Sequence, residues 1–321
     1  MDTAAWYRYF SEVETAGSSP IYERLTRAIS DDAELIARLD ELPAMKRLPT
    51  LLLAASRILD TPVDDPTRAL RHMHERWDEL LALMLARSTQ TNEAARSATF
   101  LPLLAQIDGP IALIEVGASA GLCLYPDRYR IRYDDGPWIG PAESPVRIEV
   151  RTGGTVPPVR GAIEVVSRAG IDLNPLDVKD QDDMAWLSAC IWPEHGHRQA
   201  RLRAAIEVAS REPPDLVPGD LVETIDEVLV TVPDDVTPVV FHSAVLGYLT
   251  VERRSAFAER MHAHPRARWF SNELPDVVEG ISTDLVAPEH ADTIPFYVVG
   301  VSGREAVAVS DPHGRWLTWA H

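Results

Sequence analysis

The stretch that decides the fold is IALIEVGASAGL, residues 111–122. Its first half is a nearly continuous apolar run, which is typical of a buried strand in a parallel sheet. Its second half is a turn of small residues that includes Gly117, Ser119 and Gly121. We therefore predict a strand, a tight turn and a helix at about residues 120–124, the unit from which open α/β sheets are built.

The hydrophobic pattern changes its period at this stretch. Before it, apolar residues recur at helical spacing, which predicts an all-helical N-terminal domain over residues 1–108. After it, short runs rich in valine and isoleucine alternate with helical segments, which predicts a helix-covered, mainly parallel sheet in a second domain, residues 109–321. The later strands are expected at 164–171, 216–217, 239–241 and 267–270, with antiparallel strands at 296–301, 304–309 and 315–319, and helices at 182–191, 195–210, 221–230 and 251–264.

An insertion at about residues 123–161 interrupts this order. Tyr129, Ile131 and Tyr133 alternate with arginines, the chain turns at residues 134–137, and the alternation resumes at 146–150. This pattern predicts a β-hairpin that covers the turn after the first strand.

The composition restricts the class of protein. The chain has 321 residues, of which 45% are hydrophobic and 25% are charged, as in soluble globular proteins. A net charge of -18 opposes nucleic-acid binding. The two cysteines provide neither a disulfide framework nor a metal site, the histidine pairs lack a third ligand, and no signal peptide or membrane-spanning run is present. We expect a cytoplasmic protein that acts on a small molecule, without a metal, nucleic-acid or membrane partner.

The turn after the first strand fits two kinds of enzyme. Glu115, Gly117, Ser119 and Gly121 form a pattern that resembles the first motif of class I S-adenosylmethionine-dependent methyltransferases, with Ser in place of the middle Gly. The same residues read Gly-x-Ser-x-Gly, the nucleophile elbow of α/β-hydrolases. An elbow follows a strand in the middle of the chain's strand order, whereas this strand is the first, which favours the methyltransferase. A turn that binds nothing is a third interpretation.

Polar residues follow the later strands at the edge where open α/β sheets bind ligands. Asp172 would accept hydrogen bonds from a ribose, or it stabilises its own turn. Asp220, by resemblance, would accept from an adenine amino group, or it caps the next helix. His242 and Ser243 end the fourth strand; His242 is the preferred catalytic base, or it packs beneath a helix. Glu273 would orient a substrate or cap a loop.

Motifs over nearly the whole chain are similar to those of a bacterial family catalogued as domain of unknown function 2332. The motifs are residues 89–93 with Arg96, 115–122 with 127–129, 168–175, 192–194, 219–221, 241–243 and 312–315. This resemblance implies no activity. Gln90, Asn92, Glu93 and Arg96 either line a site or begin a helix that Thr91 or Asn92 caps, with a surface pair between Glu93 and Arg96.

The sequence thus predicts a Rossmann-like, methyltransferase-type sheet with a helical N-terminal domain and a β-hairpin insertion. Its expected function is methyl transfer from S-adenosylmethionine to a small-molecule or peptide nucleophile, with His242 assisting deprotonation. One alternative is a serine hydrolase that uses Ser119 with His242 or His313. The other is a non-catalytic binding protein with a methyltransferase-like fold.

Overall fold

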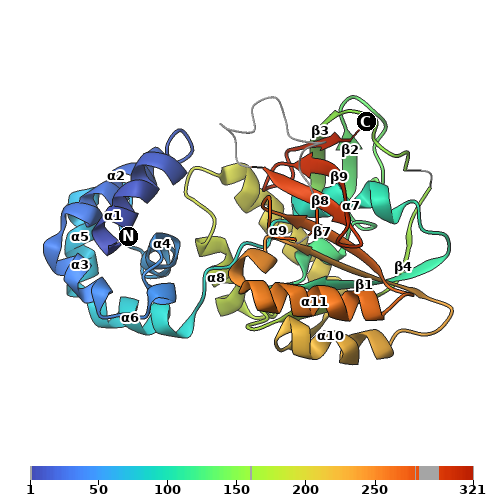
Figure 1. Ribbon diagram of the computed structural model, residues 1–321. Helices are drawn as coiled ribbons and strands as arrows, with labels where there is room; N and C mark the ends of the chain where they lie inside the picture. Colours follow the sequence, from blue (N-terminus) through green and yellow to red (C-terminus); the bar gives the residue numbers. More distant parts are fainter. Residues whose placement is uncertain (1, 160, 279, 282–295, 321) are drawn as a thin grey trace. The chain divides into compact units, whose positions relative to one another are not determined.

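The computed structural model describes residues 2–159, 161–278, 280–281 and 296–320 (Figure 1). The chain forms two compact units. The first consists of Met1–Thr91 with Lys179–Ala200, and the second of Asn92–Val178 with Arg201–His321. Residues 92–108 therefore group with the sheet, and residues 179–200 group with the N-terminal helices.

The first unit is helical. Its elements are α1 (Thr3–Tyr9), the π-helical turn η1 (Phe10–Glu14), α2 (Pro20–Asp31), α3 (Ala33–Asp40), η2 (Ala44–Lys46), α4 (Pro49–Ile58), α5 (Pro66–Glu75), α6 (Trp77–Ala86) and α8 (Gln181–Ala189). The side chains of Ser19, Asp32 and Asp65 accept hydrogen bonds from the first turns of α2, α3 and α5 and so fix where these helices begin. Among the described residues before Pro110 no strand occurs, which confirms the helical prediction for this part of the chain.

The second unit holds a large, mostly parallel sheet. Its strands are β1 (Pro110–Val116), β2 (Arg130–Tyr133), β3 (Arg147–Gly153), β4 (Glu164–Asp172), β5 (Asp215–Pro218), β6 (Thr237–Ser243), β7 (Arg268–Glu273), β8 (Tyr297–Val301), β9 (Glu305–Ser310) and β10 (Trp316–Trp319). Their spatial order is β2-β3-β10-β9-β8-β7-β6-β1-β4-β5. The strands from β5 to β7 in this order are parallel, and β8, β9 and β10 are joined by antiparallel pairing. The predicted strand positions and the antiparallel end of the sheet are confirmed.

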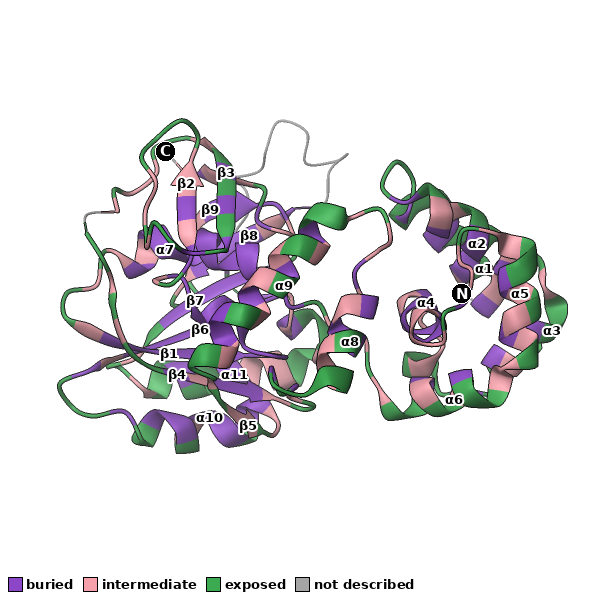
Figure 2. Ribbon diagram, turned by 180° about the vertical axis from the view of Figure 1, so that it is seen from behind, coloured by how far each residue is buried: buried purple, intermediate pink, exposed green. Residues whose placement is uncertain are grey.

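Helices cover the sheet. They are η3 (Ala94–Arg96), α7 (Ser97–Leu104), η4 (Leu122–Leu124), α9 (Gly196–Arg211), α10 (Leu221–Val230), η5 (Leu246–Tyr248) and α11 (Val251–Ala263). Helices α10 and α11 lie side by side against the sheet (Figure 1), where Ile225 and Phe257 share one core with Ile114 of β1. Figure 2 shows β6 and β7 as buried. The apolar runs of the central strands are therefore explained by burial on both faces.

The insertion is not a hairpin, which corrects the prediction. Strands β2 and β3 pair in parallel, and β3 pairs in parallel with β10, so the segment extends the sheet. The chain does turn after β2, but it returns along β2 through a single antiparallel bridge between Ile131 and Ile139. Prolines at 137, 141 and 145 explain this, because a residue without an N–H group cannot continue a ladder of hydrogen bonds.

The helix predicted at residues 120–124 is also shorter than expected. After the turn the chain forms only the 3-10 helix η4, and then enters the insertion. The turn is therefore not followed by a long helix whose N-terminal N–H groups would face a ligand.

Candidate functional site

The predicted site residues collect at one edge of the sheet, which we call the carboxyl edge: the ends of β1, β4, β5, β6 and β7. Register places Glu115 of β1 next to Phe241 of β6, and Ser243 of β6 next to Asn272 of β7. Because these strands are parallel, the residues that follow them lie at the same edge. This placement agrees with the prediction.

The glycine turn is packed against its own chain. Gly117 has a φ of 71°, and a Cβ atom built on it would lie 2.2 Å from a methyl group of Val245. The N–H groups of Gly117 and Ala118 donate to the carbonyl of Ile171 at 2.7 and 3.2 Å, and Ser119 N donates to Asp172 at 2.7 Å. Glycine is required here for packing, and these three donors serve β4.

Asp172 and Asp220 both carry structural hydrogen bonds. The Asp172 carboxylate accepts from the N–H groups of Ser119 and Asn174. Asp220 caps α10 by accepting from Val222 N at 2.8 Å, and it forms an ion pair with Arg253. The structural roles that the sequence analysis gave as alternatives, a turn at Asp172 and an N-cap at Asp220, are thus present. A carboxylate has about four acceptor positions, so these partly exposed groups keep capacity for a ligand. Their roles in cofactor binding stay predictions.

His242 is buried with a partner on each ring nitrogen. Nδ1 lies 2.7 Å from Glu273 Oε1, and Trp269 Nε1 donates to Nε2 at 3.0 Å. Glu273 also accepts from the N–H groups of Val245 and Leu246. The indole N–H is only a donor, so Nε2 is unprotonated and the proton of the neutral ring lies on Nδ1. In this conformation Nε2 already accepts a hydrogen bond, as expected for a packed histidine. Its role as a base stays a prediction.

Glu115 is the acidic residue of the edge with an unpartnered buried atom. The side chain is 4% exposed, and Oε2 has no hydrogen-bond partner. Burial raises the pKa of this carboxyl to about 8; a hydrogen bond from Cys123 and the charge of Arg96 lower it, and Asp172 raises it. The group therefore retains its proton near neutral pH, because an isolated buried carboxylate is costly.

Residues 92–96 form a contact between the glycine turn and the edge. Asn92 accepts from Leu122 N at 2.9 Å, which fixes the end of the turn. Glu93 caps η3 through Ala95 N and pairs with Arg201 at 2.6 Å. The predicted cap at Thr91 or Asn92 and the predicted surface pair of Glu93 with Arg96 are therefore wrong: Glu93 is buried and needs a cation that is itself partly buried.

Arg96 reaches the carboxyl edge from η3. Its guanidinium donates to the carbonyls of Pro312, from Nε at 2.8 Å, and Ser243, from Nη1 at 3.3 Å, and lies 5.9 Å from the ring centre of Tyr297. Gly314 lets the turn at 312–315 pack against η3, because a Cβ atom there would lie 2.5 Å from the carbonyl oxygen of Ala95. The turn motif thus positions an acceptor for Arg96.

Sequence reasoning missed a row of buried hydrogen bonds beside this arginine. Asn272 donates to Ser243 Oγ at 3.0 Å, and Ser310 donates to Asn272 at 2.7 Å. Ser310 is fully buried at the end of β9. A polar residue directly after the apolar run at 306–309 was the available signal.

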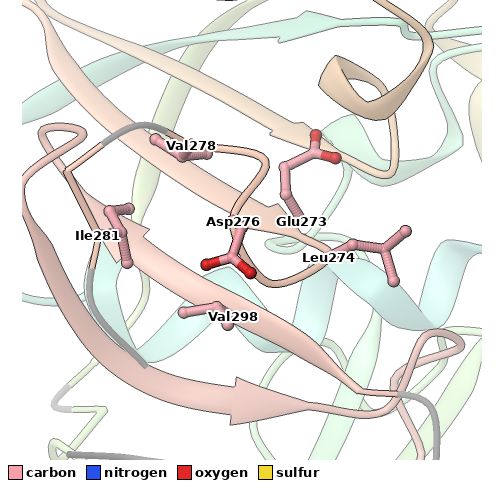
Figure 3. Close-up of a pocket in the computed structure, with 6 residues that line it drawn as sticks. All are labelled: Glu273, Leu274, Asp276, Val278, Ile281 and Val298. Carbon is pink, nitrogen blue, oxygen red and sulfur yellow. The ribbon is translucent and has the colours of Figure 1, made fainter. Parts of the chain in front are cut away.

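A shallow pocket lies beside the end of β7 (Figure 3). It is lined by Glu273, Leu274, Asp276, Val278, Ile281 and Val298. Figure 3 shows the carboxylates of Glu273 and Asp276 there among apolar side chains. Among the described residues, none of those that line the pocket is positively charged, which does not favour an anion there.

The described residues contain no group of three His, Cys, Asp or Glu side chains suited to a metal ion. Within the same ranges, no helix combines the length and the apolar character that crossing a membrane requires.

Comparison with known proteins identifies a family. A family model described as "Uncharacterized protein conserved in bacteria (DUF2332)" matches residues 4–67 and 58–319. No curated protein matches the chain. The family match agrees with the resemblance of the sequence motifs.

Proposed function

We propose that this chain, which belongs to the uncharacterized bacterial protein family DUF2332, is an S-adenosylmethionine-dependent methyltransferase. The observation that carries the proposal is the order of the central parallel strands, β5-β4-β1-β6-β7. Counted along the chain, this order is 3-2-1-4-5, as in doubly wound sheets, which bind ligands where the order reverses. That point lies between β1 and β6, next to Glu115 and His242.

The side chains at this point suit the cofactor. Three neighbouring strands carry a carboxyl group at this edge: Glu115 near the end of β1, Asp172 at the end of β4, and Asp220 after β5. The cofactor presents an ammonium group, two ribose hydroxyls and an adenine amino group, all of which donate hydrogen bonds to carboxyl oxygens. We assign the ammonium group to Glu115, whose Oε2 lacks a partner, the ribose to Asp172 and the adenine to Asp220.

The glycine turn has an indirect role in this proposal. Its N–H groups at 117–119 donate hydrogen bonds to β4, and Val245 occupies the space beside Gly117. We therefore assign the cofactor contacts to the carboxyl groups. The turn positions two of them: it ends β1 one residue after Glu115, and Ser119 N holds Asp172 in place.

Bound S-adenosylmethionine supplies an electrophilic methyl group. The residues of the chain orient the acceptor and exclude water, which is the main source of catalysis in such a displacement. The acceptor is assigned to the ends of β6 and β7, beside Ser243 and Glu273. Glu273 orients the His242 ring through Nδ1, and the ring accepts a proton at Nε2 only in a conformation in which the Trp269 N–H has left that atom.

Calorimetric and thermal-shift titrations with S-adenosylmethionine and S-adenosylhomocysteine test the proposal. A ligand at 100 times its Kd stabilises the folded state by about 2.7 kcal/mol. Asp172→Asn should weaken binding at least tenfold. The matched control is Glu164→Gln at the other end of β4, where the exposed side chain should not affect binding. If neither compound binds the unaltered protein, the proposal is wrong.

The hydrolase alternative has less support. Ser119 has a positive φ of 53°, which suits a nucleophile elbow. However, a serine nucleophile needs a histidine Nε2 as its base, and the Nε2 of His242 accepts from Trp269. Covalent labelling of Ser119 by a fluorophosphonate would favour the hydrolase.

A further inference from the structure

Arg96 is a buried cation whose described partners include no carboxylate. The residue is 5% exposed, and its guanidinium contacts two main-chain carbonyls and the ring of Tyr297. Nη2 has no partner among the described residues, yet it is not among the fully buried unpartnered atoms, so it reaches solvent. Buried charges in proteins are normally paired. The guanidinium therefore has a free donor group and an unbalanced charge.

Two other arginines of the same unit, whose side chains are at most 16% exposed, are paired with carboxylates. Arg168, whose side chain is 4% exposed, lies 2.7 Å from Asp127, and Arg201 lies 2.6 Å from Glu93. The buried carboxylate of Asp311 also has a cation, the exposed Arg315 at 2.7 Å. The chain thus supplies carboxylates to arginines in similar surroundings, and the lack of one at Arg96 among the described residues points to a partner from outside the chain.

The acids around Arg96 do not replace that partner. Glu273 is hydrogen-bonded to His242 and to the N–H groups of Val245 and Leu246. Asp311, although fully buried, is held by Arg315. The positive charge of Arg96 acts on Glu115, but burial keeps the pKa of that carboxyl at about 8, so most of it is neutral at pH 7.

We propose that Arg96 binds the carboxylate of a small-molecule ligand at the carboxyl edge. Arginine carries five N–H donors, of which two have partners here, and the remaining ones include Nη2, which is open to solvent. The flat guanidinium suits a flat carboxylate, with the ring of Tyr297 beside it. A phosphate dianion would bring a second negative charge close to Glu273 and Asp311, so a singly charged anion is favoured. This site does not require the proposed methyl transfer.

The probes are sodium benzoate and sodium acetate, with benzamide as the uncharged match of benzoate and inorganic phosphate as the competing anion. Saturation-transfer NMR and titration calorimetry measure their binding to the full chain. We expect both carboxylates to bind, benzamide not to bind, and phosphate to bind more weakly than benzoate. Arg96→Gln should weaken benzoate binding at least tenfold. The matched control, Arg147→Gln, changes an exposed arginine on β3 and should leave binding unchanged.

If Arg96→Gln does not fold, Arg96→Lys is used instead, because it keeps the positive charge. Lysine lacks the planar fork, so benzoate binding should still fall. The proposal is overturned if neither carboxylate binds the unaltered protein, if phosphate binds more tightly, or if the folded variants bind benzoate as the unaltered protein does. Titration with S-adenosylmethionine is run in parallel. Binding of benzoate without binding of the cofactor would reject the methyltransferase and retain the carboxylate site.

Discussion

Glu115→Gln should stabilise the protein, and the gain should depend on pH. Burial raises the pKa of Glu115 from 4.5 to about 8 in the folded state. Between these two pH values the folded carboxyl keeps a proton that the unfolded chain has released, so this group's contribution to stability is complete below pH 4.5 and is lost as the pH rises to about 8. Glutamine has nearly the same shape as the protonated acid and does not titrate.

The size of the effect follows from the separation of the two pKa values. At pH 7 the unfolded carboxyl lies roughly 2.5 pH units above its pKa, and at about 1.36 kcal/mol per unit the folded state loses about 3 kcal/mol. Near pH 5 the same calculation gives a loss of stability of less than about 1 kcal/mol. The difference in stability between Glu115→Gln and the unaltered protein should therefore grow steadily across this range.

Urea unfolding followed by circular dichroism and tryptophan fluorescence, repeated at several pH values between 5 and 8.5, measures this difference. Glu164→Gln is the control, because its exposed carboxyl on the first residue of β4 shows no comparable burial. The control should follow the unaltered protein at every pH. If the curves of free energy against pH run parallel for Glu115→Gln and the unaltered protein, Glu115 is ionised in the folded state and the reasoning fails.

Two further predictions concern packing and charge, and both are measured as free energies of unfolding. Gly117→Ala should destabilise the protein by about 2–4 kcal/mol, because the new Cβ atom meets Val245 and the positive φ disfavours alanine. Val245→Ala removes the methyl groups that this Cβ atom meets, so in that background Gly117→Ala should cost less. Equal losses with and without Val245→Ala would reject the contact. Arg201→Gln should lower the free energy of unfolding by about 3–5 kcal/mol, because it leaves Glu93 buried without its cation. The control Arg211→Gln removes a surface ion pair and should lower it by less than about 1 kcal/mol. Similar losses for the two variants would show that burial of the first pair is unimportant.

The strands were predictable because burial determines their composition. A strand covered on both faces needs a continuous apolar run, and β1 and β6 carry such runs. The direction of a strand was not predictable in the same way. Alternation in β2 and β3 reports which face is buried and contains no information on whether the partner runs parallel or antiparallel. The predicted hairpin failed for this reason.

The edge of the site was predictable, but its hydrogen bonds were not. The sequence places Glu115 and His242 at the ends of their strands, since parallel strands end at a common edge. The contacts of Arg96 join residues 147 and 216 positions apart, so they depend on the assembled sheet. The engagement of His242 by Trp269 likewise follows from the pairing of β6 with β7.

The place of β10 in the sheet has a consequence for biosynthesis. Strands β2 and β3 reach the remaining strands through β10, which pairs with β3 on one side and with β9 on the other. During translation, residues 130–153 leave the ribosome long before residues 316–319 do. The edge of β3 that pairs with β10 therefore stays unpaired until β10 has been synthesised. Unpaired strand edges are prone to aggregation, so we expect chaperones to bind this segment during that time.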